Sequence, residues 1–388
     1  MKQKKILTQS EIATFKACPQ KHWWRYRLLW VPYLVAASTL EGAGDHKGLE
    51  FLYKGLPYDV CELAIREIFD NYLLKHQEAI SKPDDYREAR ERCVKVFQNY
   101  ISYWWGKDNR TAHHPDTGEP LIETEFQIPI YSPSGRASRL FMLRGKWDRL
   151  VIIDGEVWIE ENKTRAEISE TSGDRLVLDQ QARIYCYAAM IYLGIPVRGV
   201  YYNLLRRKDA GRPGINKDGT VSVQRVDTTL DVYMDTLHRQ DAYLKSLTEE
   251  DRKARKQAKG LTWEKYEKEI ERIKNIKWFD RFYQPYDEID YREVQNDLYQ
   301  ISLQMHQCKY PYKNDGACDH WGGCQYRPVC QDRDPEPYFR VASKKHSELY
   351  ATHFHAPLGE PYRLLGQERK AKIIGTRGLL EAVCSQPL

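Results

Sequence analysis

Apolar and polar positions divide the middle of the chain into short segments with the two-residue period of a β-strand. Residues 121–131 alternate apolar and polar side chains, which predicts a strand with one buried face. Residues 143–153 and 156–164 carry apolar side chains on both faces, which is typical of central strands covered on both sides. Segments 197–207 and 277–284 predict two further strands.

Longer segments with the period of an α-helix separate and flank these strands. A strong one covers 178–193 and ends at Gly194, which suits a helix C-cap, and another covers 287–307. Because strand, helix and strand follow one another here, the connection is a crossover and the sheet is mixed or parallel. The pattern predicts an α/β fold with a mixed sheet flanked by helices, and helical insertions at about 55–110 and 228–275.

The N-terminal segment 8–30 has a helical period that Cys18 and Pro19 interrupt, because proline suits a helix break or the first turn of a second helix. Cys18 by itself is compatible with a small buried thiol. The sequence KHWWRYR that follows, at 21–27, mixes cations with aromatic rings. It fits either a nucleic-acid contact by stacking and charge or an amphipathic helix with an aromatic core side.

Residues 37–54 place glycines ahead of a histidine. Gly42 and Gly44 predict a turn in which the backbone approaches another group closely, followed by a helix that carries His46. A single histidine is compatible with a packed or solvated side chain as well as with a metal ligand. His46 is therefore a candidate that needs partners from elsewhere in the chain.

The pair Asp154-Gly155 joins two of the predicted strands and is a strong hairpin signal, because two-residue turns favour Asp-Gly. Counting back from this turn places Asp148 opposite Glu161. Directly opposed residues share a face of the sheet, with Cβ atoms roughly 4.5–5.5 Å apart. Lys163 lies two residues beyond Glu161 and points to the same face.

Two facing carboxylates destabilise a hairpin unless a positive charge lies between them. A divalent cation supplies that charge, since Mg²⁺ favours one or two carboxylates together with water and phosphate oxygens. Asp148 followed by Glu161-x-Lys163 therefore suits metal-assisted hydrolysis of a phosphodiester, with the lysine orienting water or neutralising charge. The alternative is a surface hairpin with an ordinary Glu161–Lys163 salt bridge, while Glu160 and Arg149 face each other on the opposite side.

Composition limits the class of protein only moderately. A length of 388 residues allows one large or two moderate domains, and 27 tyrosines with 10 tryptophans argue against disorder. A net charge of +5 is weak evidence for nucleic-acid binding. The N-terminus lacks the apolar region of a signal peptide, and the best apolar run, 185–197, is too short to span a bilayer. We expect a soluble, cytoplasmic protein with no membrane contact.

Nine cysteines, an odd number in a chain without an export signal, argue against a disulfide framework. Cys318, Cys324 and Cys330 follow a C-x5-C-x5-C spacing with glycines and a proline between them. Thiolates at this density predict Zn²⁺ or an iron–sulfur cluster. The fourth ligand would be Cys308 nearby or Cys18 near the other end of the chain.

Five short motifs follow one another along the chain and precede the cysteine triplet. They are Cys18-Pro19 with its aromatic-basic segment, Gly42-x-x-x-His46, Gly145-x-x-Asp148, Glu161-x-Lys163-Thr164 and Gln181-x-x-x-Tyr185. In this order they resemble the RecB-like branch of the PD-(D/E)xK nuclease superfamily. The resemblance is strongest to members with a terminal iron–sulfur cluster, such as the AddB nuclease domain, CRISPR adaptation nucleases and phage exonucleases.

The resemblance covers roughly residues 7–331 and implies a restriction-endonuclease-like core. It implies a nuclease domain at 1–331, with the cluster loop at 308–331, and leaves 332–388 as a C-terminal extension of unknown role. The cluster would be [4Fe–4S], held by Cys18, Cys318, Cys324 and Cys330, and would link the two ends of the domain. The first spacing of five residues, where several relatives have two, keeps Zn²⁺ as the alternative, and Cys308 remains an extra candidate ligand.

The resemblance also implies a second, catalytic metal site. His46, Asp148 and Glu161 would bind Mg²⁺ or Mn²⁺, with the main-chain carbonyl of Asn162 as a further ligand. Lys163 would position or activate the attacking water.

Two residues of the predicted helix 178–193 complete the implied site. Gln181 and Tyr185 lie four residues apart on one helix face and would brace the site and touch the DNA backbone. Without the resemblance, Tyr185 is equally compatible with the core and Gln181 with solvent.

The function implied is a metal-dependent DNA exonuclease that acts on single strands or duplex ends in recombination, repair or mobile-element DNA processing. The chain has no Gly-x-x-x-x-Gly-Lys-Ser/Thr motif, so a helicase or recombination protein would be a separate partner. The alternatives are a catalytically idle DNA-binding or assembly subunit that keeps the fold, and a zinc-stabilised enzyme with other chemistry.

Overall fold

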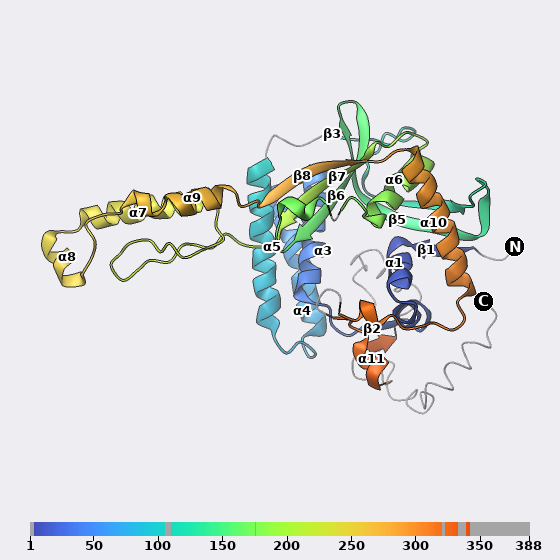
Figure 1. The fold of residues 1–388 in the computed structure, drawn as a ribbon, viewed down its shortest axis with the longest axis horizontal. Coiled ribbons are helices and arrows are strands. Elements are labelled where there is room, and N and C mark those ends of the chain that lie inside the picture. The colour runs from blue at the N-terminus through green and yellow to red at the C-terminus, as the bar shows by residue number, and fades with distance from the viewer. Residues whose placement is uncertain (1–3, 105–109, 175, 320–322, 333–338, 342–388) are drawn as a thin grey trace.

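A mixed β-sheet of seven strands organises the computed structural model of the protein (Figure 1). The structure describes residues 4–104, 110–174, 176–319, 323–332 and 339–341. Five strands follow the order β1-β5-β6-β7-β8, and β3 and β4 also pair with β5. The predicted mixed α/β fold is therefore confirmed. The strands are β1 (Lys5–Thr8), β3 (Arg110–Thr111), β4 (Ile122–Tyr131), β5 (Ala137–Ile153), β6 (Glu156–Arg165), β7 (Gly199–Arg206) and β8 (Phe279–Pro285).

The β5–β6 hairpin turns at Asp154 and Gly155, as predicted. Their φ angles of 52° and 82° are the left-handed values that a two-residue type I′ turn requires. The predicted register is also confirmed for the ladder next to the turn, where Ile153 lies opposite Glu156. Because side chains alternate between faces, this register decides which side chains of the hairpin reach the pocket described below.

The hairpin ladder ends at Arg149 and Glu160, the pair predicted to face away from Asp148. Both side chains are buried, and Nη2 of Arg149 lies 2.7 Å from Oε2 of Glu160. The guanidinium also lies 3.5 Å from the centre of the Tyr53 ring. A buried charge pair with an aromatic cover resists a shift in register, because any slip would leave two unpaired charges inside the protein.

The crossover from β6 to β7 passes through α6 (Gln180–Leu193), which begins two residues later than predicted. The Asp179 side chain caps its N-terminus, and Gly194 ends it with a left-handed φ of 67°. Strands β6 and β7 are parallel, and β8 is antiparallel to β7. Helix α6 and helix α10 (Glu288–Gln307) pack against the sheet to form the largest hydrophobic core.

A second layer contains α3 (Ala37–Tyr53), α4 (Tyr58–His76) and α5 (Pro83–Trp104), which share a core with Leu205 and Phe279 of the sheet. The predicted glycine-rich turn before His46 is wrong, because Gly42 and Gly44 lie inside α3. A Cβ on Gly44 would come within 2.8 Å of Sγ of Cys93 in α5. This glycine therefore permits close helix packing instead of a turn.

Strand β1 was not predicted from the sequence pattern. It pairs in parallel with the N-terminal half of β5, which begins at Ala137, earlier than expected. The last residue of β1, Thr8, caps α1 (Gln9–Ala17) by accepting a hydrogen bond from the backbone N–H of Glu11. The end of β1 thus fixes the start of the first helix.

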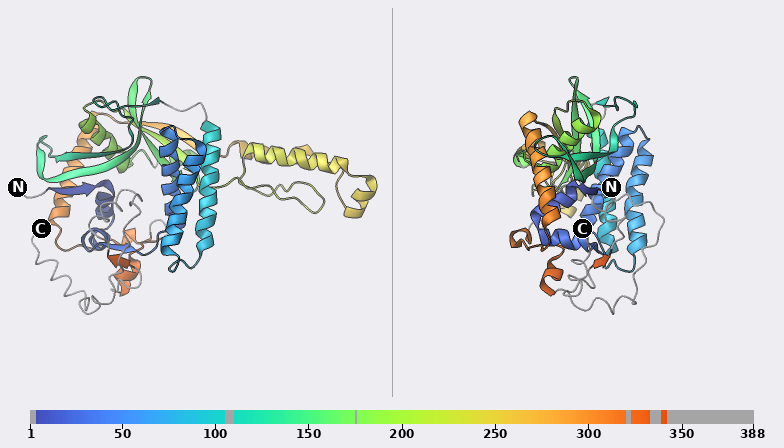
Figure 2. Two further views of the ribbon diagram at one scale, coloured as in Figure 1. Left: turned by 180° about the vertical axis from the view of Figure 1, so that it is seen from behind. Right: turned by 90° about the vertical axis from the view of Figure 1, so that its right-hand side faces the viewer.

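Between β7 and β8 the chain forms an arm that projects from the sheet (Figures 1 and 2). Its helices are α7 (Leu230–Ser246), α8 (Glu249–Arg255) and α9 (Glu267–Lys274), in the range 228–275 predicted as helical. The arm has its own small core, centred on Tyr233 and Tyr266. It is therefore a folded unit that packs on itself.

Segments from near the two ends of the described chain lie together below the sheet, where Figure 1 labels β2 (Trp30–Pro32) and α11 (Arg327–Asp332). Helix α1 ends at Cys18 and α2 (Pro19–His22) follows, as Cys18-Pro19 predicted. Strand β2 pairs with β9 (Phe339–Val341), so the chain continues from α11 back to the N-terminal segment.

The aromatic rings of 21–27 belong to the protein interior. Trp23 is buried, and Trp24 stacks on Trp30 with ring centres 4.9 Å apart. The Tyr326 hydroxyl donates to the Trp30 carbonyl at 2.6 Å. These contacts favour the amphipathic-core interpretation of this segment.

Most of the predicted C-terminal extension, 332–388, lies outside the described residues. Within the part of the chain that the structure describes, every helix is too short or too polar to span a bilayer.

Candidate functional site

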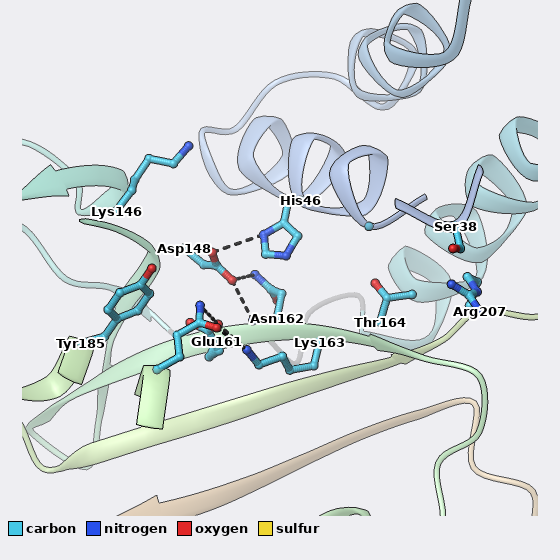
Figure 3. A pocket seen from close by; sticks show the side chains of 12 residues that line it. Ser38, His46, Lys146, Asp148, Glu161, Asn162, Lys163, Thr164, Tyr185 and Arg207 are labelled. Atoms are coloured by element: carbon cyan, nitrogen blue, oxygen red, sulfur yellow. Dashed lines mark hydrogen bonds and ion pairs between the residues drawn. The ribbon is translucent and has the colours of Figure 1, made fainter. Parts of the chain in front are cut away.

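A pocket of about 280 Å³ lies between α3 and the strands β5 and β6 (Figure 3). We call it the acidic pocket. It is lined by all six side chains that were predicted for the catalytic site: His46, Asp148, Glu161, Lys163, Gln181 and Tyr185. Its other lining residues are Ser38, Gly42, Lys146, Asn162, Thr164 and Arg207.

Asp148 lies at the point where the hairpin ladder stops. Its Oδ2 accepts hydrogen bonds from the backbone N–H of Asn162 at 2.8 Å and from the Asn162 side chain at 3.3 Å. Its Oδ1 faces Nδ1 of His46 at 3.3 Å (Figure 3). The aspartate side chain therefore takes the place of the next ladder contact and connects β6 to α3.

Glu161 is buried and only one of its oxygens is paired. Oε1 accepts hydrogen bonds from Lys163 at 2.8 Å and from Gln181 at 2.8 Å. Oε2 is buried and has no hydrogen-bond partner among the described residues. Burial, and then the negative charge of Asp148, raise the pKa of Glu161 to about 7, although Lys163 opposes the shift. A bound cation would therefore stabilise this buried carboxylate more than it would stabilise a carboxylate in solvent.

Lys163 is held by acceptors on two elements. Its Nζ lies 2.8 Å from Oε1 of Glu161, 3.1 Å from Oε1 of Gln181 and 3.5 Å from Oδ2 of Asp179. Burial lowers the pKa of Lys163, but the charges of Glu161 and Asp179 outweigh it and the net shift is upward. The amine is therefore a fixed positive charge at neutral pH.

Glu123 is an acid beside the pocket lining that was not predicted from the sequence. It lies in β4 between Ile122 and Thr124, whose partners in β5 are Arg149 and Trp147, so it lies across from Asp148. One ligand atom each of Glu123, His46 and Asp148 form a cluster in which every pair lies within 4.8 Å. Those three atoms are close enough to share one cation.

The backbone and the ion pairs of Glu123 are unusual for a strand. Its φ is 48°, a left-handed value that is uncommon outside glycine and is found at functional sites. Its carboxylate pairs with Lys146 and lies 3.9 Å from Nδ1 of His46. The signal that could have identified it was the antiparallel register of 121–131 against β5, which places an acid beside Asp148.

The charges around His46 set its protonation. Burial lowers the pKa of His46, but the carboxylates of Asp148 and Glu123 outweigh it and raise the pKa well above its usual value. In the absence of another cation, the imidazolium thus neutralises part of the acid charge.

A buried acid behind the pocket connects α3 to β6. Asp45 accepts hydrogen bonds from Oγ1 of Thr164 at 2.7 Å and from Sγ of Cys93 at 3.2 Å. Burial raises its pKa to about 6, while Thr164 and Cys93 oppose the shift. Because Asp45 precedes His46 and Thr164 follows Lys163, this contact fixes the two sides of the pocket relative to each other.

Tyr185 belongs both to the pocket and to the core, so the alternative of a core residue was partly correct. Its ring meets the Phe126 ring edge-on, with centres 5.8 Å apart. A Cβ on Gly145 would come within 2.5 Å of Phe126 and 3.2 Å of Tyr185, so the glycine of Gly-x-x-Asp leaves room for both rings. Gln181 is not merely solvated, because it bridges Glu161 and Lys163.

Cys18, Cys318, Cys324 and Cys330 lie in segments that contact one another below the sheet, and we call this region the cysteine junction. Sγ of Cys318 donates to the Asn314 carbonyl at 3.8 Å, and the Asn314 side chain donates to the carbonyl of Ala17, the residue before Cys18. The neighbouring Lys313 donates to the Cys330 carbonyl at 3.0 Å. The backbone N–H of Cys324 donates to the Cys318 carbonyl at 2.7 Å. All four predicted thiols therefore belong to one neighbourhood.

Cys308, the extra candidate ligand, lies in a different environment. It is the C-cap of α10 and packs against the main core. Burial raises its pKa and the nearby Arg27 opposes the shift. Its surroundings therefore favour Cys18 over Cys308 as the fourth member of the cysteine junction.

Comparison with known proteins identifies the family of the chain. A family profile described as the PD-(D/E)XK nuclease superfamily matches residues 6–331, which is most of the chain. The matched range contains both the acidic pocket and the cysteine junction. No curated protein matches the sequence significantly.

Proposed function

The chain belongs to the PD-(D/E)XK nuclease superfamily, and on that premise we propose that it is a Mg²⁺- or Mn²⁺-dependent DNA exonuclease of the RecB-like branch. The superfamily implies a metal-dependent nuclease with DNA as a substrate. The observation that carries the proposal is the convergence of Asp148, Glu161 and Lys163 with His46 in one pocket. Single strands or duplex ends are the proposed substrates.

The pocket residues fit a divalent cation. Asp148, Glu161 and His46 are its proposed ligands. Glu123 is a further candidate, because its carboxylate belongs to one cluster of ligand atoms with His46 and Asp148, a cluster that does not include Glu161. The unpaired Oε2 of Glu161 supports this assignment, since a buried carboxylate oxygen without a partner is costly. The Asn162 carbonyl stays a proposed additional ligand. A bound Mg²⁺ or Mn²⁺ would polarise a phosphate oxygen and lower the pKa of a bound water.

The remaining pocket side chains have roles that follow from their contacts. Lys163 keeps its proton, so it acts by charge and position: it orients the attacking water and offsets charge on the phosphate. Gln181 holds both Lys163 and Glu161 in place, since it donates to one and accepts from the other. Tyr185 supports the wall of the pocket and is proposed to contact the DNA backbone.

At the cysteine junction we propose a [4Fe–4S] cluster held by Cys18, Cys318, Cys324 and Cys330, with Zn²⁺ as the alternative. The contacts of Lys313 and Asn314 with Cys330, Cys318 and the neighbour of Cys18 support the ligand set. Because Cys18 ends α1 and the other three follow α10, the group would fasten the two ends of the domain and act structurally.

The alternative function is a DNA-binding or assembly subunit that keeps the fold without activity. The hydrogen-bonded Glu161–Lys163–Gln181 arrangement argues against it, because an inactive relative has no need of a buried, mutually repelling acid pair. The wider expectations are a cytoplasmic protein of recombination, repair or mobile-element processing, and a helicase or recombination partner on a separate chain.

The deciding experiment is a digestion time course on end-labelled single- and double-stranded DNA, with Mg²⁺, with Mn²⁺ and with EDTA. We expect metal-dependent release of nucleotides from ends, and loss of release in Asp148→Asn. Glu156→Gln is the matched control, because Glu156 lies on the same hairpin but is solvent-exposed. Metal-dependent DNA binding without any hydrolysis by the unmodified protein would support the inactive-subunit alternative instead.

A further inference from the structure

Two tyrosines between α10 and α11 are exposed to an extent that aromatic side chains rarely show. Tyr310 is 81 % exposed and Tyr312 is 66 % exposed, the highest values for large aromatic side chains among the described residues. They belong to the sequence Lys-Tyr-Pro-Tyr-Lys at 309–313, which we call the tyrosine loop. Both lysines are also exposed. Large apolar rings left in solvent and flanked by cations indicate a binding surface.

From these residues we propose that the tyrosine loop is a stacking platform for the bases of a single DNA strand that enters the acidic pocket. The inference rests on the proposed nuclease function and specifies the substrate as single-stranded near the pocket. Aromatic rings stack on unpaired bases of any sequence, and lysines beside them contact the phosphates. In a duplex the base faces are already stacked on one another, so the rings would have little to bind.

The loop is fixed in position although its rings are exposed. The Tyr312 carbonyl accepts a hydrogen bond from the backbone N–H of Gln20 at 3.0 Å. The Asn314 side chain donates to the Ala17 carbonyl at 2.8 Å, and Nζ of Lys313 donates to the Cys330 carbonyl at 3.0 Å. Because the backbone is held to α1, α2 and α11, the rings lose little freedom when a base stacks on them.

A short series of contacts leads from the acidic pocket to the loop. Lys163 lies 3.5 Å from Asp179, the N-cap of α6. Gln180, the first residue of α6, accepts a hydrogen bond from Nζ of Lys16 in α1 at 3.1 Å. The next residue of α1, Ala17, is the one that holds Asn314. The start of α6 and the end of α1 therefore connect the pocket to the tyrosine loop.

The tyrosine loop, and not the segment 21–27, carries the aromatic-basic character that nucleic-acid binding needs. The Trp23 ring is buried and Trp24 stacks on Trp30, so these rings are already used within the protein. The lysines of the loop favour a polyanion such as DNA over an apolar protein surface.

The test measures binding without cleavage, in the Asp148→Asn protein with Ca²⁺. Fluorescence anisotropy compares an oligo(dT) strand of about 20 nucleotides with a blunt duplex of the same length. For Tyr310→Ala/Tyr312→Ala we expect at least about tenfold weaker binding of the strand and less than about twofold change for the duplex. Tyr310→Phe/Tyr312→Phe should restore strand binding, because phenylalanine keeps the stacking ring.

The matched control is Tyr243→Ala on α7, a tyrosine that is 42 % exposed and lies on the arm. It should leave strand binding unchanged. Strand binding that survives the double alanine change, or an equal loss for strand and duplex, would overturn the inference. Digestion by the unmodified protein is measured in parallel. Strand binding that depends on the two tyrosines, without any hydrolysis, would contradict the proposed nuclease function and still support the stacking platform.

Discussion

The acidic pocket and the cysteine junction are both clusters of chemically reactive side chains, but the fold assembles them in opposite ways. The pocket is set by adjacent strands of one sheet and a helix laid across them, and its acids repel one another. The junction gathers thiols from segments about 300 residues apart in the chain, where no strand of the main sheet holds them. The pocket is a strained site on a rigid sheet, whereas the junction, with its proposed cluster, would hold distant segments of the chain together.

This contrast separates what each cluster does for stability. Glu161 has a raised pKa and an unpaired buried oxygen, so removing its charge relieves a cost. The proposed cluster at the cysteine junction would connect α1 to the loop before α11 and would restrict the unfolded chain. Substitutions in the pocket should therefore reduce activity with little effect on stability, and substitutions in the junction should do the reverse.

Lys163→Ala should show the largest effect on activity. We expect about a 10³-fold loss of metal-dependent DNA hydrolysis, because the change removes the lysine that pairs with Glu161 and would offset charge on the reacting phosphate. The thermal midpoint should change by less than about 3 °C, since Glu161 can take up a proton when its partner is lost. The measurements are initial rates on end-labelled DNA and differential scanning fluorimetry.

Lys16→Ala, which removes a cation near the pocket but outside it, is the control and should retain most activity. Undiminished hydrolysis by Lys163→Ala would contradict the assigned role of this lysine.

Cys324→Ser should show the largest effect on stability. We expect the absorbance near about 400 nm to disappear from anaerobically purified protein and the thermal midpoint to fall by at least about 5 °C. Residual protein that stays folded should still hydrolyse DNA, because the acidic pocket lies elsewhere.

Cys308→Ser is the matched control and should keep the absorbance, because Cys308 packs against the main core. Loss of colour in Cys308→Ser but not in Cys18→Ser would reverse the choice of the fourth ligand. A colourless, zinc-loaded unmodified protein would replace the cluster by Zn²⁺.

Glu123→Gln tests whether the pocket has a ligand beyond the predicted three. We expect a 10- to 100-fold loss of activity at low Mg²⁺, partly recovered at high Mg²⁺, because the change weakens metal binding and leaves Lys163 in place. Glu125→Gln on the same strand is the control, since Glu125 is 61 % exposed and pairs with Arg144. Equal metal requirements for Glu123→Gln and the unmodified protein would remove Glu123 from the site.

Changing the pH should give the smallest effect. It tests how much the buried charge of Glu161 destabilises the metal-free protein. The pKa of Glu161 is about 7 in the folded protein, above its ordinary value, so its proton stabilises the metal-free fold at low pH and this contribution is lost as pH rises through 7. Asp45, with a pKa of about 6, acts in the same direction. A metal ion must displace the Glu161 proton, so its stabilising effect should be larger at pH 8 than at pH 6.

The measurement is the rise in thermal midpoint on adding Ca²⁺ at each pH. Glu161→Gln should abolish most of the difference between the two pH values. A rise that is independent of pH in the unmodified protein would show that Glu161 does not meet the ion.

The parts of the fold that local chemistry dictates were predictable from the sequence. Asp154-Gly155 specified the turn, and the turn specified the register as far as Arg149 and Glu160. Gly194 likewise marked the end of α6. Each of these features depends on residues that are close together in the chain.

The features that were missed depend on distant partners. Strand β1 has four residues and is defined by its pairing with β5, more than 130 residues away. Glu123 looks like an ordinary polar position of an alternating strand until β4 is aligned with Asp148. The sequence predicts a turn at Gly44, because a glycine that allows a turn and one that allows close helix packing look alike without the opposing helix.

The arm between β7 and β8 has a consequence for how this sheet tolerates change. The two strands are antiparallel neighbours, and their ladder ends with Leu205 opposite Phe279, so the bases of the arm meet at one edge. Since the arm has its own core, a tight reversal of a few residues could replace it without altering any strand. The connection between β7 and β8 is thus a natural insertion point, where one accessory segment can replace another without changing the strands of the neighbouring site.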